Sequence, residues 1–401
     1  MNLLKDISLK NKKVLVRVDF NVPLNKKKEV ADNTRIFAVK PTIDYILKNQ
    51  GICILMTHFG RPEGKIIDFS IEHILGEVQK TLNRDIVFVN DCIGPKVKKA
   101  AESLKAGQIL LLENLRFYKQ ETQGEEVFSK NLADIADVYV NDAFGASHRK
   151  HASIAVVAKY FKEKCAGFLL EQETKAITQF LESKQNPVTA IIGGAKVSSK
   201  IPVIKSLLSS VDNLLIGGGM AYTFIKSKGG HIGESIFEPD MLPACNELLE
   251  EAVDKGVLLL LPEDVIAADR FDNNAQTKTL NASNIENGWM GLDIGEKTQK
   301  TFNKTINDSK TILWNGPLGV FEMDSFSTGT KAVADAVVAT TKNGGFSLVG
   351  GGDSVAALKK FKLVDKVSYV STGGGAMLES LEGKALPGIV ALSKQKGEYN
   401  D

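Results

Sequence analysis

The stretch Pro187-Val-Thr-Ala-Ile-Ile-Gly-Gly-Ala-Lys-Val-Ser-Ser-Lys-Ile201 contains the features around which the chain is organised. Its apolar run Val188–Ile192, rich in β-branched residues, predicts a buried strand. Gly193-Gly194 then allow a sharp turn and a close approach of the backbone to a ligand. Lys196 and Lys200 lie four residues apart, so a helix would show both on one face. This arrangement suits phosphate binding. An ordinary strand-to-helix turn with surface lysines explains the stretch equally well.

The composition indicates a globular protein with several domains. The chain has 401 residues, of which 43% are hydrophobic and 24% charged. This length favours two or three domains. The four cysteines lie far apart, which predicts neither a disulfide framework nor a zinc site but reduced, mostly buried thiols in a cytoplasmic protein. The N-terminus lacks the apolar core of a signal peptide, and no apolar run approaches membrane-spanning length, so no membrane partner is expected.

The charge is unevenly distributed along the chain. Residues 1–170 contain 27 Lys and Arg against 20 Asp and Glu, whereas residues 171–401 contain 23 against 28. A basic half attracts anionic ligands. Its basic residues are scattered and are not interleaved with aromatic residues, which argues against nucleic acid as a partner.

Short apolar runs alternate with helical patterns along the whole chain. Such alternation predicts parallel sheets covered by helices on both faces. Roughly a dozen strands are more than one compact sheet usually holds, so we expect two doubly wound α/β domains of similar size. The helical pattern Glu171–Ser183 is a candidate hinge helix between them. The strands are expected at Val14–Val18, Ile52–Thr57, Ile86–Val89, Ile109–Leu112, Val138–Val140, Ala166–Leu170, Val188–Ile192, Leu214–Ile216, Val257–Leu261, Thr311–Trp314, Phe346–Val349 and Val367–Val370.

Polar and cationic residues follow the expected strands of the first half. Ligands of open parallel sheets bind at the carboxyl ends of the strands, where these turns meet. The turns carry or lead to four arginines, whose planar guanidinium groups match phosphate and carboxylate oxygens. Unrelated surface ion pairs are the other interpretation, but they leave this repeated placement to chance. We therefore expect an anion site built from Asp19-Phe-Asn-Val-Pro23, Arg35, His58-Phe-Gly-Arg-Pro62, Glu113-Asn-Leu-Arg116 and Asn141-Asp-Ala-Phe-Gly-Ala-Ser-His-Arg149.

His148 and His151 are spaced like two metal ligands on a helix. No third ligand is indicated, and the neighbouring Arg149 and Lys150 would repel a cation. Polar support of the anion site is the preferred interpretation, and a metal pair is the alternative.

Glycine clusters repeat after the expected strands of the second half. Three of them precede helical patterns and would offer free backbone N–H groups to a polyphosphate. Asp353 follows Gly350-Gly-Gly352, where a carboxylate can cap a helix or reach phosphate-bound Mg²⁺. Asn315 can reach a phosphate, and Glu322 can accept from ribose hydroxyls. No Gly-x-x-x-x-Gly-Lys-Ser/Thr sequence occurs, so this is not a P-loop.

Taken together and in order, these motifs resemble those of the phosphoglycerate kinase family and span nearly the whole chain. The resemblance implies two Rossmann-like domains. We expect an N-terminal phosphoglycerate-binding domain at residues 1–170, a hinge helix at 171–186 and a C-terminal nucleotide-binding domain at 187–385. The resemblance also implies that residues 386–401 pack back on the N-terminal domain. The motifs are Val18-Asp-Phe-Asn-Val-Pro23, His58-Phe-Gly-Arg-Pro62, Leu112-Glu-Asn-Leu-Arg-Phe117, Asp142-Ala-Phe-Gly145, Gly193-Gly-Ala-Lys-Val197, Trp314-Asn-Gly-Pro317, Gly350-Gly-Gly-Asp353 and Ser371-Thr-Gly-Gly-Gly-Ala376.

Site residues follow from the resemblance position by position. Arg35 and Lys196 are assigned to catalysis, and Lys196 would meet the transferred phosphoryl group. Asp353 would contact the Mg²⁺ that accompanies ADP or ATP. Ser354 stands where many members have threonine and keeps the hydroxyl. The resemblance implies a substrate site of Asp19, Phe20, Asn21, Arg35, His58, Phe59, Gly60, Arg61, Arg116 and Arg149, and a nucleotide site of Lys200, Asn315, Glu322, Gly351, Gly352, Asp353 and Ser354.

The reaction implied is a reversible step of glycolysis, in which 1,3-bisphosphoglycerate and MgADP give 3-phosphoglycerate and MgATP. Direct transfer requires alignment and charge neutralisation, not a nucleophilic residue. The chain accordingly has no Gly-x-Ser-x-Gly sequence. A cytoplasmic monomer is expected.

Two other functions remain open at the level of sequence. A dinucleotide-dependent dehydrogenase would require Gly-x-Gly-x-x-Gly, which is absent. An anion-binding scaffold explains the arginines but gives no reason for Lys196, Glu322 and Asp353.

Overall fold

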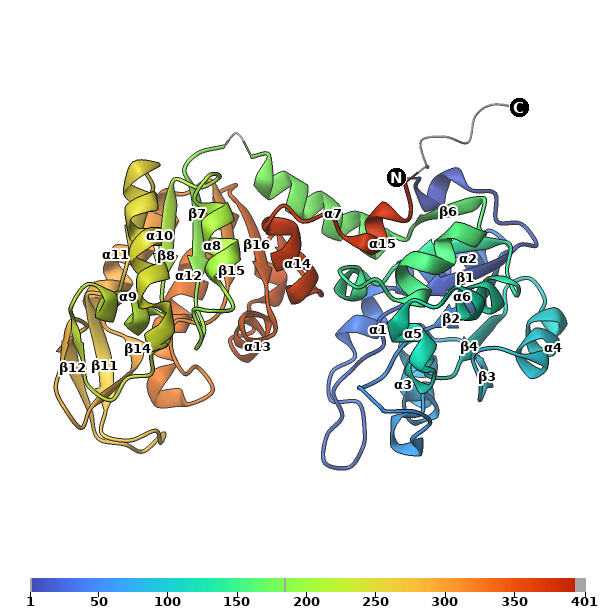
Figure 1. The fold of residues 1–401 in the computed structure, drawn as a ribbon, viewed down its shortest axis with the longest axis horizontal. Helices are drawn as coiled ribbons and strands as arrows, with labels where there is room; N and C mark the ends of the chain where they lie inside the picture. The colour runs from blue at the N-terminus through green and yellow to red at the C-terminus, as the bar shows by residue number, and fades with distance from the viewer. Residues whose placement is uncertain (1, 184, 394–401) are drawn as a thin grey trace. The chain divides into compact units, whose positions relative to one another are not determined.

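The computed structural model describes residues 2–183 and 185–393, which form two compact units. The first unit contains residues 2–175 and 385–393, and the second contains residues 176–384. The chain leaves the first unit within α7 (Phe168–Leu181) and returns to it after Lys384 (Figure 1). The helix expected from Glu171 thus begins earlier, at Phe168. Residues 394–401 of the expected C-terminal segment lie outside the described residues.

The first unit is built on a six-stranded sheet in which every neighbouring pair is parallel. The central strands are buried along almost their whole length, as their continuous apolar sequences predict. In sheet order the strands are β3 (Val87–Val89), β4 (Ile109–Leu112), β2 (Ile52–Met56), β1 (Lys13–Arg17), β5 (Val138–Asn141) and β6 (Glu163–Ala166).

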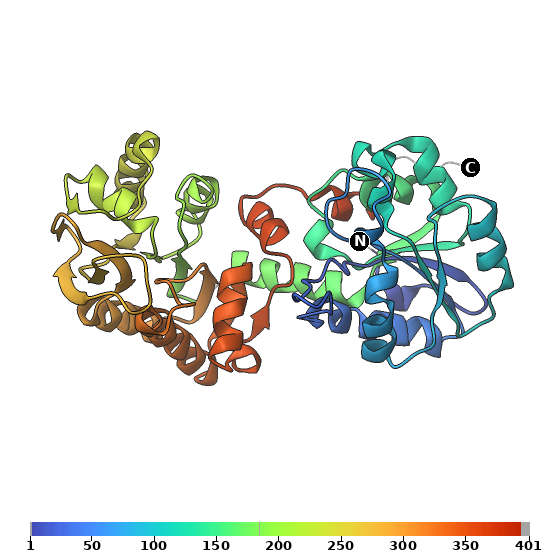
Figure 2. The ribbon, with the colours of Figure 1, turned by 90° about the horizontal axis from the view of Figure 1, so that it is seen from below.

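Helices cover both faces of this sheet (Figure 2). Helix α3 buries Ile74, Val78 and Leu82, which recur every four residues and form one apolar stripe. It ends at Asn83, whose backbone is left-handed at φ +54°. The helices are α1 (Thr34–Ala38), α2 (Lys40–Lys48) and α3 (Glu72–Leu82), which pack together, then α4 (Pro95–Ser103), and α5 (Lys119–Gln123) and α6 (Glu126–Ala133), which pack against the π-helical turn η5 (Ala152–Val156).

The expected sixth strand, Ala166–Leu170, is wrong in its position. The edge strand β6 ends at Ala166, and Phe168 already belongs to α7. The first turn of α7 is capped from the first unit: the Thr42 hydroxyl accepts from Phe168 N at 2.8 Å, and Asp142 Oδ1 accepts from Leu170 N at 3.1 Å. These caps stabilise a helix in a run that is otherwise apolar enough for a strand.

The second unit repeats the architecture with a second six-stranded parallel sheet. From the central pair β7 and β15, the sheet continues in chain order towards both edges, through β8 and β10 on one side and through β16 and β17 on the other. The strands in order are β10 (Leu258–Leu260), β8 (Asn213–Ile216), β7 (Val188–Ile192), β15 (Thr311–Asn315), β16 (Phe346–Gly350) and β17 (Tyr369–Val370).

Helices again lie on both faces of the second sheet (Figure 2). Helix α10 packs against α9, and α11 packs against α12. The helices are α8 (Ile201–Leu207), α9 (Ala221–Ser227), α10 (Leu242–Asp254), α11 (Glu296–Asp308), α12 (Thr328–Lys342), α13 (Gly352–Lys360) and α14 (Gly374–Leu381). The two expected doubly wound sheets are therefore confirmed.

The second unit also contains strands that the sequence did not predict. Three antiparallel strands stand in the order β12 (Thr277–Asn281), β11 (Asp264–Ala268) and β14 (Met290–Ile294). The short strands β9 (His231–Ile232) and β13 (Asn284–Ile285) pair beside them. Strand β12 alternates between exposed and half-buried residues, so it lacks the continuous apolar run by which the parallel strands were recognised.

Two further expectations concern the chain as a whole. All four cysteines lie in the described part of the chain and are buried and unpaired, as predicted. Within residues 2–183 and 185–393, no helix combines the length and the apolar character that crossing a membrane requires.

Candidate active site

The turns after β4, β2, β1 and β5 adjoin at the carboxyl edge of the first sheet, because these four strands are neighbours. The sequence predicted that the first-half candidates would meet at such an edge, and the structure brings them together there. Asp19, Phe20 and Asn21 follow β1, His58, Phe59, Gly60 and Arg61 follow β2, Arg116 follows β4, Arg149 follows β5, and Arg35 comes from α1.

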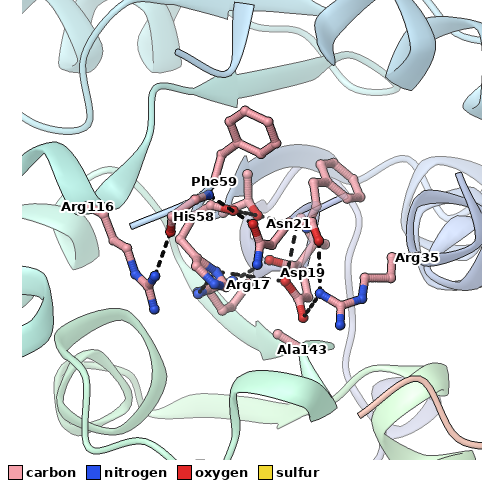
Figure 3. A network of polar contacts seen from close by, with 12 residues as sticks. Arg17, Asp19, Asn21, Arg35, His58, Phe59, Arg116 and Ala143 are labelled. Carbon is pink, nitrogen blue, oxygen red and sulfur yellow. Dashed lines mark hydrogen bonds and ion pairs between the residues drawn. The ribbon is translucent and has the colours of Figure 1, made fainter. Parts of the chain in front are cut away.

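Asp19 is the carboxylate at the centre of this cluster (Figure 3). Its Oδ2 pairs with Arg35 Nη1 at 3.2 Å, and its Oδ1 lies 3.8 Å from His58 Nδ1. The same Arg35 nitrogen donates to the backbone oxygen of Asn21 at 2.9 Å. Asp19 therefore holds Arg35 against the loop after β1.

Gly60 joins the loops after β1, β2 and β4. Its N–H donates to Asn21 Oδ1 at 2.9 Å, and its carbonyl accepts from Arg116 Nη1 at 2.6 Å. Its φ is +61°, and a side chain there would overlap the ring of Phe69. Only glycine suits this conformation and this space.

Phe20 and Phe59 have side chains that belong to the hydrophobic core of the first unit. Phe20 N donates to the Thr57 hydroxyl at 2.9 Å, and Phe59 N donates to Asn114 Oδ1 at 3.1 Å. Their core contacts hold the loops after β1 and β2 in place, and the polar residues beside Phe20 and Phe59 face the cluster.

Burial and mutual repulsion lower the pKa values of two arginines at this edge. Burial, followed by Arg149, Arg17 and Arg61, lowers the pKa of Arg116 to about 10. The pKa of Arg149 is also lowered, first by burial. Arg116 Nε and Arg149 Nη1 are buried and have no hydrogen-bond partner among the described residues. Buried donors without acceptors are costly, so this edge is suited to an anion that supplies the acceptors.

A cavity of about 850 Å³ opens beside these arginines. Arg61, Arg116, Arg149, His148 and His151 are among the residues that line it. Burial and the nearby Arg149, Arg17 and Arg116 lower the pKa of His151 to about 4. The same arginines would repel a metal cation, so the two histidines are better suited to an anion.

In the second unit three glycine turns pack against one another at the carboxyl ends of β7, β8 and β15. A Cβ on Gly193 would come within 2.1 Å of Pro317 O, and one on Gly218 within 2.7 Å of Gly194 N. Gly316 makes the same close approach to Gly193. This backbone packing leaves no room for side chains and creates a surface on which a polyphosphate can rest against main-chain N–H groups.

Lys196 and Lys200 do not share a helix face, and this expectation is wrong. Helix α8 begins only at Ile201, with Pro202 in its first turn. Lys196 is exposed in the preceding turn, whereas Lys200 is half-buried at the N-cap. Proline favours the first helical turn, which shifts the helix start past both lysines.

Lys200 instead lies against the end of β15. Its Nζ donates to Asn315 Oδ1, and Asn315 Nδ2 donates to the backbone oxygen of Gly350 at 2.9 Å. Burial lowers the pKa of Lys200, and the nearby Asp353 opposes that shift. Lys200, Asn315 and Asp353 are thus brought together at the ends of β15 and β16.

Helix α13 begins at this point and supplies several expected residues. Gly351 is its N-cap, with φ +94°, and Gly352 and Asp353 stand in its first turn. The Ser354 hydroxyl is buried and accepts from Gly316 N at 2.6 Å. Ser354 therefore supports the turn after β15, whereas Asp353 is exposed at the helix N-terminus.

A mainly apolar cavity of about 620 Å³ adjoins these turns. Gly194, Gly218 and Gly219 form part of its wall, and Glu322 and Asp353 add carboxylates. Apolar surfaces with a few polar groups are typical of pockets for small ligands with a flat ring system. The remaining lining is made by Ala195, Tyr222, Glu234, Ile236, Phe271, Met290, Gly291, Leu292, Pro317, Leu318, Gly319, Val320 and Met323.

Comparison with known proteins identifies the family. A family model described as phosphoglycerate kinase matches residues 4–384. The chain belongs to the phosphoglycerate kinase family. It is 50% identical to the phosphoglycerate kinase of Moorella thermoacetica, over 98% of this chain and 99% of that protein. It is 49% identical to the cytosolic phosphoglycerate kinase of Nicotiana tabacum, over 97% of each. The structure of phosphoglycerate kinase from Coxiella burnetii matches with a TM-score of 0.88 and 40% identity over 98% of each chain.

Mg²⁺ bound with a nucleotide is usually held by one or two carboxylates together with phosphate oxygens. Asp353 offers one exposed carboxylate in the first turn of α13. The described part of the chain contains no group of three His, Cys, Asp or Glu side chains that could hold a metal ion. The residues present therefore fit a cation that arrives with the nucleotide.

Sequence reasoning missed two parts of these sites. Arg17 was assigned only to the strand Val14–Val18 and not to the site, yet it is buried beside the cluster and contacts His58. A charged residue in an otherwise apolar strand was the available signal. Tyr222 was missed although it closely follows the glycines 217–219, because its side chain carries no charge or phosphate-binding group that marks it in the sequence. Phe271 was missed because it lies in the loop after β11, which contains no glycine cluster.

Proposed function

We propose that this chain catalyses the reversible transfer of a phosphoryl group from 1,3-bisphosphoglycerate to ADP, giving 3-phosphoglycerate and ATP. Its membership of the phosphoglycerate kinase family supports this proposal. The observation that carries it is the arginine cluster of the first unit, with buried guanidinium nitrogens that have no acceptor among the described residues. A small phosphorylated carboxylic acid supplies such acceptors at both of its ends.

In the first unit we assign 3-phosphoglycerate to the cavity lined by Arg61, Arg116 and Arg149. Arg35, oriented by Asp19 and Asn21, would neutralise charge on the phosphoryl group during transfer. His58 and the backbone of the loop after β2 complete the set. Arg35 is thus proposed as a catalytic residue as well as a binding residue.

In the second unit we assign the nucleotide to the apolar cavity and the glycine turns. The base would occupy the apolar wall, Glu322 would accept from the ribose hydroxyls, and the phosphates would lie near Lys200, Asn315 and the N-terminus of α13. Asp353 would hold Mg²⁺ together with the nucleotide phosphates, where the ion neutralises phosphate charge. Lys196, exposed in the turn after Gly194, is free to follow the phosphoryl group.

Direct transfer needs the acyl phosphate and ADP to meet in line while water is excluded. Since the two ligands are assigned to different units, we propose that α7, through which the chain passes from one unit to the other, serves as a hinge. We also propose a monomer in the cytoplasm, the latter by analogy with the cytosolic tobacco relative. Gel filtration and cell fractionation test these two assignments.

The decisive experiment is an assay of ATP formation from 1,3-bisphosphoglycerate and MgADP. We expect ATP and 3-phosphoglycerate in equal amounts, and the reverse reaction when both products are supplied in excess. A dehydrogenase would instead require a nicotinamide cofactor, and an anion-binding scaffold would bind the phosphoglycerates without forming ATP. Either result would overturn the proposal.

A further inference from the structure

Glu121 is a fully buried carboxylate that lies close to the arginine cluster but outside the residues assigned to either ligand. It belongs to the short helix α5. Both of its oxygens accept hydrogen bonds from Ser153: Oε2 accepts from Ser153 N at 2.9 Å, and Oε1 accepts from the Ser153 hydroxyl at 2.6 Å. Oε1 also lies 3.8 Å from His151 Nδ1. Burying a charge is costly unless hydrogen bonds compensate it, so this pair of bonds fixes Ser153 firmly.

Ser153 in turn contacts Arg17 and fixes its orientation. The hydroxyl has one proton, which it donates to Glu121, and its oxygen accepts from Arg17 Nε at 2.8 Å. Arg17 is the last residue of β1 and is buried. Its Nη1 donates to the backbone oxygen of Val18, and its Nη2 lies 3.1 Å from His58 Nδ1. All three guanidinium nitrogens of Arg17 are therefore engaged.

The contact between Arg17 and His58 determines the protonation of the imidazole. A guanidinium group can only donate, so His58 Nδ1 must accept, and the single ring proton then resides on Nε2. The charged neighbours agree: burial, Arg17, Arg116, Arg149 and His151 together lower the pKa of His58 well below its ordinary value. Asp19 faces the ring from the other side, 3.8 Å from Nδ1. The contacts of Arg17 and Asp19 are both made at Nδ1, which leaves the Nε2–H for a ligand.

We propose that Glu121 and Ser153 are positioning residues of the phosphoglycerate site: they align Arg17, which holds His58 as a neutral imidazole whose Nε2–H donates to the anionic substrate. Figure 3 shows Arg17 beside His58. The proposal rests on the proposed function for the identity of the substrate. The tautomer of His58 in the free protein does not depend on that identity.

The test uses Ser153→Ala. This variant removes the hydroxyl but keeps the backbone N–H that donates to Glu121, so the fold should be disturbed little. Glu121→Gln removes the charge and redirects one donor towards Ser153. Ser153→Thr retains a hydroxyl and serves as the rescue variant. The matched control is Ser129→Ala, which removes another buried hydroxyl of the same unit, one that donates to Glu125 O at 2.8 Å.

Nitrogen NMR of the imidazole rings in the free, full-length protein reports the tautomer. We expect wild type and Ser129→Ala to show His58 neutral with its proton on Nε2 across about pH 6 to 8, and Ser153→Ala and Glu121→Gln to show a mixture of tautomers. The KM for 3-phosphoglycerate should rise about tenfold in these two variants, as loss of one aligned charged hydrogen bond predicts, with a smaller change in kcat. Ser153→Thr should recover both values.

The positioning role is overturned if Ser153→Ala keeps the wild-type tautomer, or if the tautomer mixes while the KM for 3-phosphoglycerate stays at the value of Ser129→Ala. Absence of phosphoryl transfer by the wild-type protein overturns the proposed function instead. The NMR measurement still decides the link between Glu121, Ser153, Arg17 and His58 in that case.

Discussion

At the scale of single residues, the proposed binding role of Arg149 is accompanied by a cost to the free protein. Repulsion from Arg17, Arg61 and Arg35 contributes to its lowered pKa. We expect Arg149→Gln to raise the KM for 3-phosphoglycerate by about tenfold or more, because a charged donor to the anion is lost. Without ligand, the same variant should unfold at a temperature about 2 °C higher at low ionic strength, because repulsion is relieved.

Enzyme kinetics and thermal unfolding check both parts of this prediction. Arg270→Gln is the control, since Arg270 is exposed in the second unit and pairs with Asp269 at 3.3 Å. An Arg149→Gln variant that is less stable than wild type at low salt would show that packing by this side chain outweighs the repulsion.

Lys196 and Lys200 should differ in what their removal costs. Lys196 is exposed, and we propose that it contacts the phosphoryl group only during transfer. Lys196→Ala should therefore lower kcat and kcat/KM together by roughly a hundredfold. Lys200 is held against Asn315, so Lys200→Ala should weaken ADP binding. Steady-state kinetics and calorimetry decide, with the exposed Lys205→Ala as control. Near-normal turnover in Lys196→Ala with a raised KM for ADP would make Lys196 a binding residue.

Most residues of the arginine site were predictable because they sit in turns after strands, a position that sequence patterns reveal; Arg35, in α1, was found through the helix-cap pattern before it. Arg17, Glu121 and Ser153 were not, since their importance arises from contacts between residues far apart in the chain. Nothing in the local sequence of α5 shows that Glu121 will be fully buried. Such contacts depend on tertiary packing and are visible only in the folded structure.

At the scale of elements, the N-terminus of α7 is sensitive to pH through Asp142. Burial raises the pKa of Asp142 to about 7 from an ordinary value of 3.8. Between these values the folded chain holds a proton that the unfolded chain releases, so stability falls as pH rises through this window. Asp142→Asn cannot ionise, and it should unfold at a temperature several degrees above wild type at about pH 8 but not at about pH 4.

Thermal unfolding of both proteins across this range is the measurement. Asp293→Asn is a companion variant in the second unit, because burial also raises the pKa of Asp293 to about 7. If the wild-type and Asp142→Asn unfolding temperatures change in parallel with pH, Asp142 is charged in the folded protein and this account of the α7 cap is wrong.

The glycine turns of the second unit owe their shape to close packing as well as to backbone freedom, and two substitutions separate these causes. Gly218 has φ +67° and lies against Gly194 and Pro317, whereas Gly229 has φ +86° and open space around it. Gly229→Ala should cost only the backbone strain, roughly 1 kcal/mol. Gly218→Ala should cost more and also weaken ADP binding, because the turns must move apart. Equal losses of stability and unchanged ADP affinity would show that close packing is unimportant here.

The main elements could be predicted because buried parallel strands are continuous apolar runs, and their order along the chain alternates with helices. The antiparallel strand β12 escaped because it alternates between exposed and half-buried residues. Strands β11 and β14 are largely buried, but Asp264 at the start of β11 and Gly291 and Asp293 within β14 interrupt their apolar sequences. The start of α8 and the end of β6 were misplaced because capping and proline, more than apolar periodicity, decide where a helix begins.

At the scale of the whole molecule, we expect the radius of gyration to fall only when both ligands are present. The reason is that each ligand is assigned to its own unit, and transfer requires the two to meet. The measurement is the radius of gyration from small-angle scattering. It is compared between the free protein and the protein with 3-phosphoglycerate alone, with MgADP alone and with both ligands. An unchanged radius with both ligands bound, alongside normal turnover, would exclude a large closure about α7.

The return of the chain to the first unit affects the order in which the two units can fold during translation. The short helix α15 (Pro387–Val390) supplies Gly388, whose N–H donates to Ser147 O at 2.9 Å and whose carbonyl accepts from Asn141 at 3.2 Å. These bonds support the loop that leads to Arg149. A ribosome releases residues 176–384 before α15, so the second unit can fold completely before the first, although most of the first unit is translated earlier. We therefore expect the loop that leads to Arg149 to lack these bonds in a nascent chain until α15 has emerged from the ribosome.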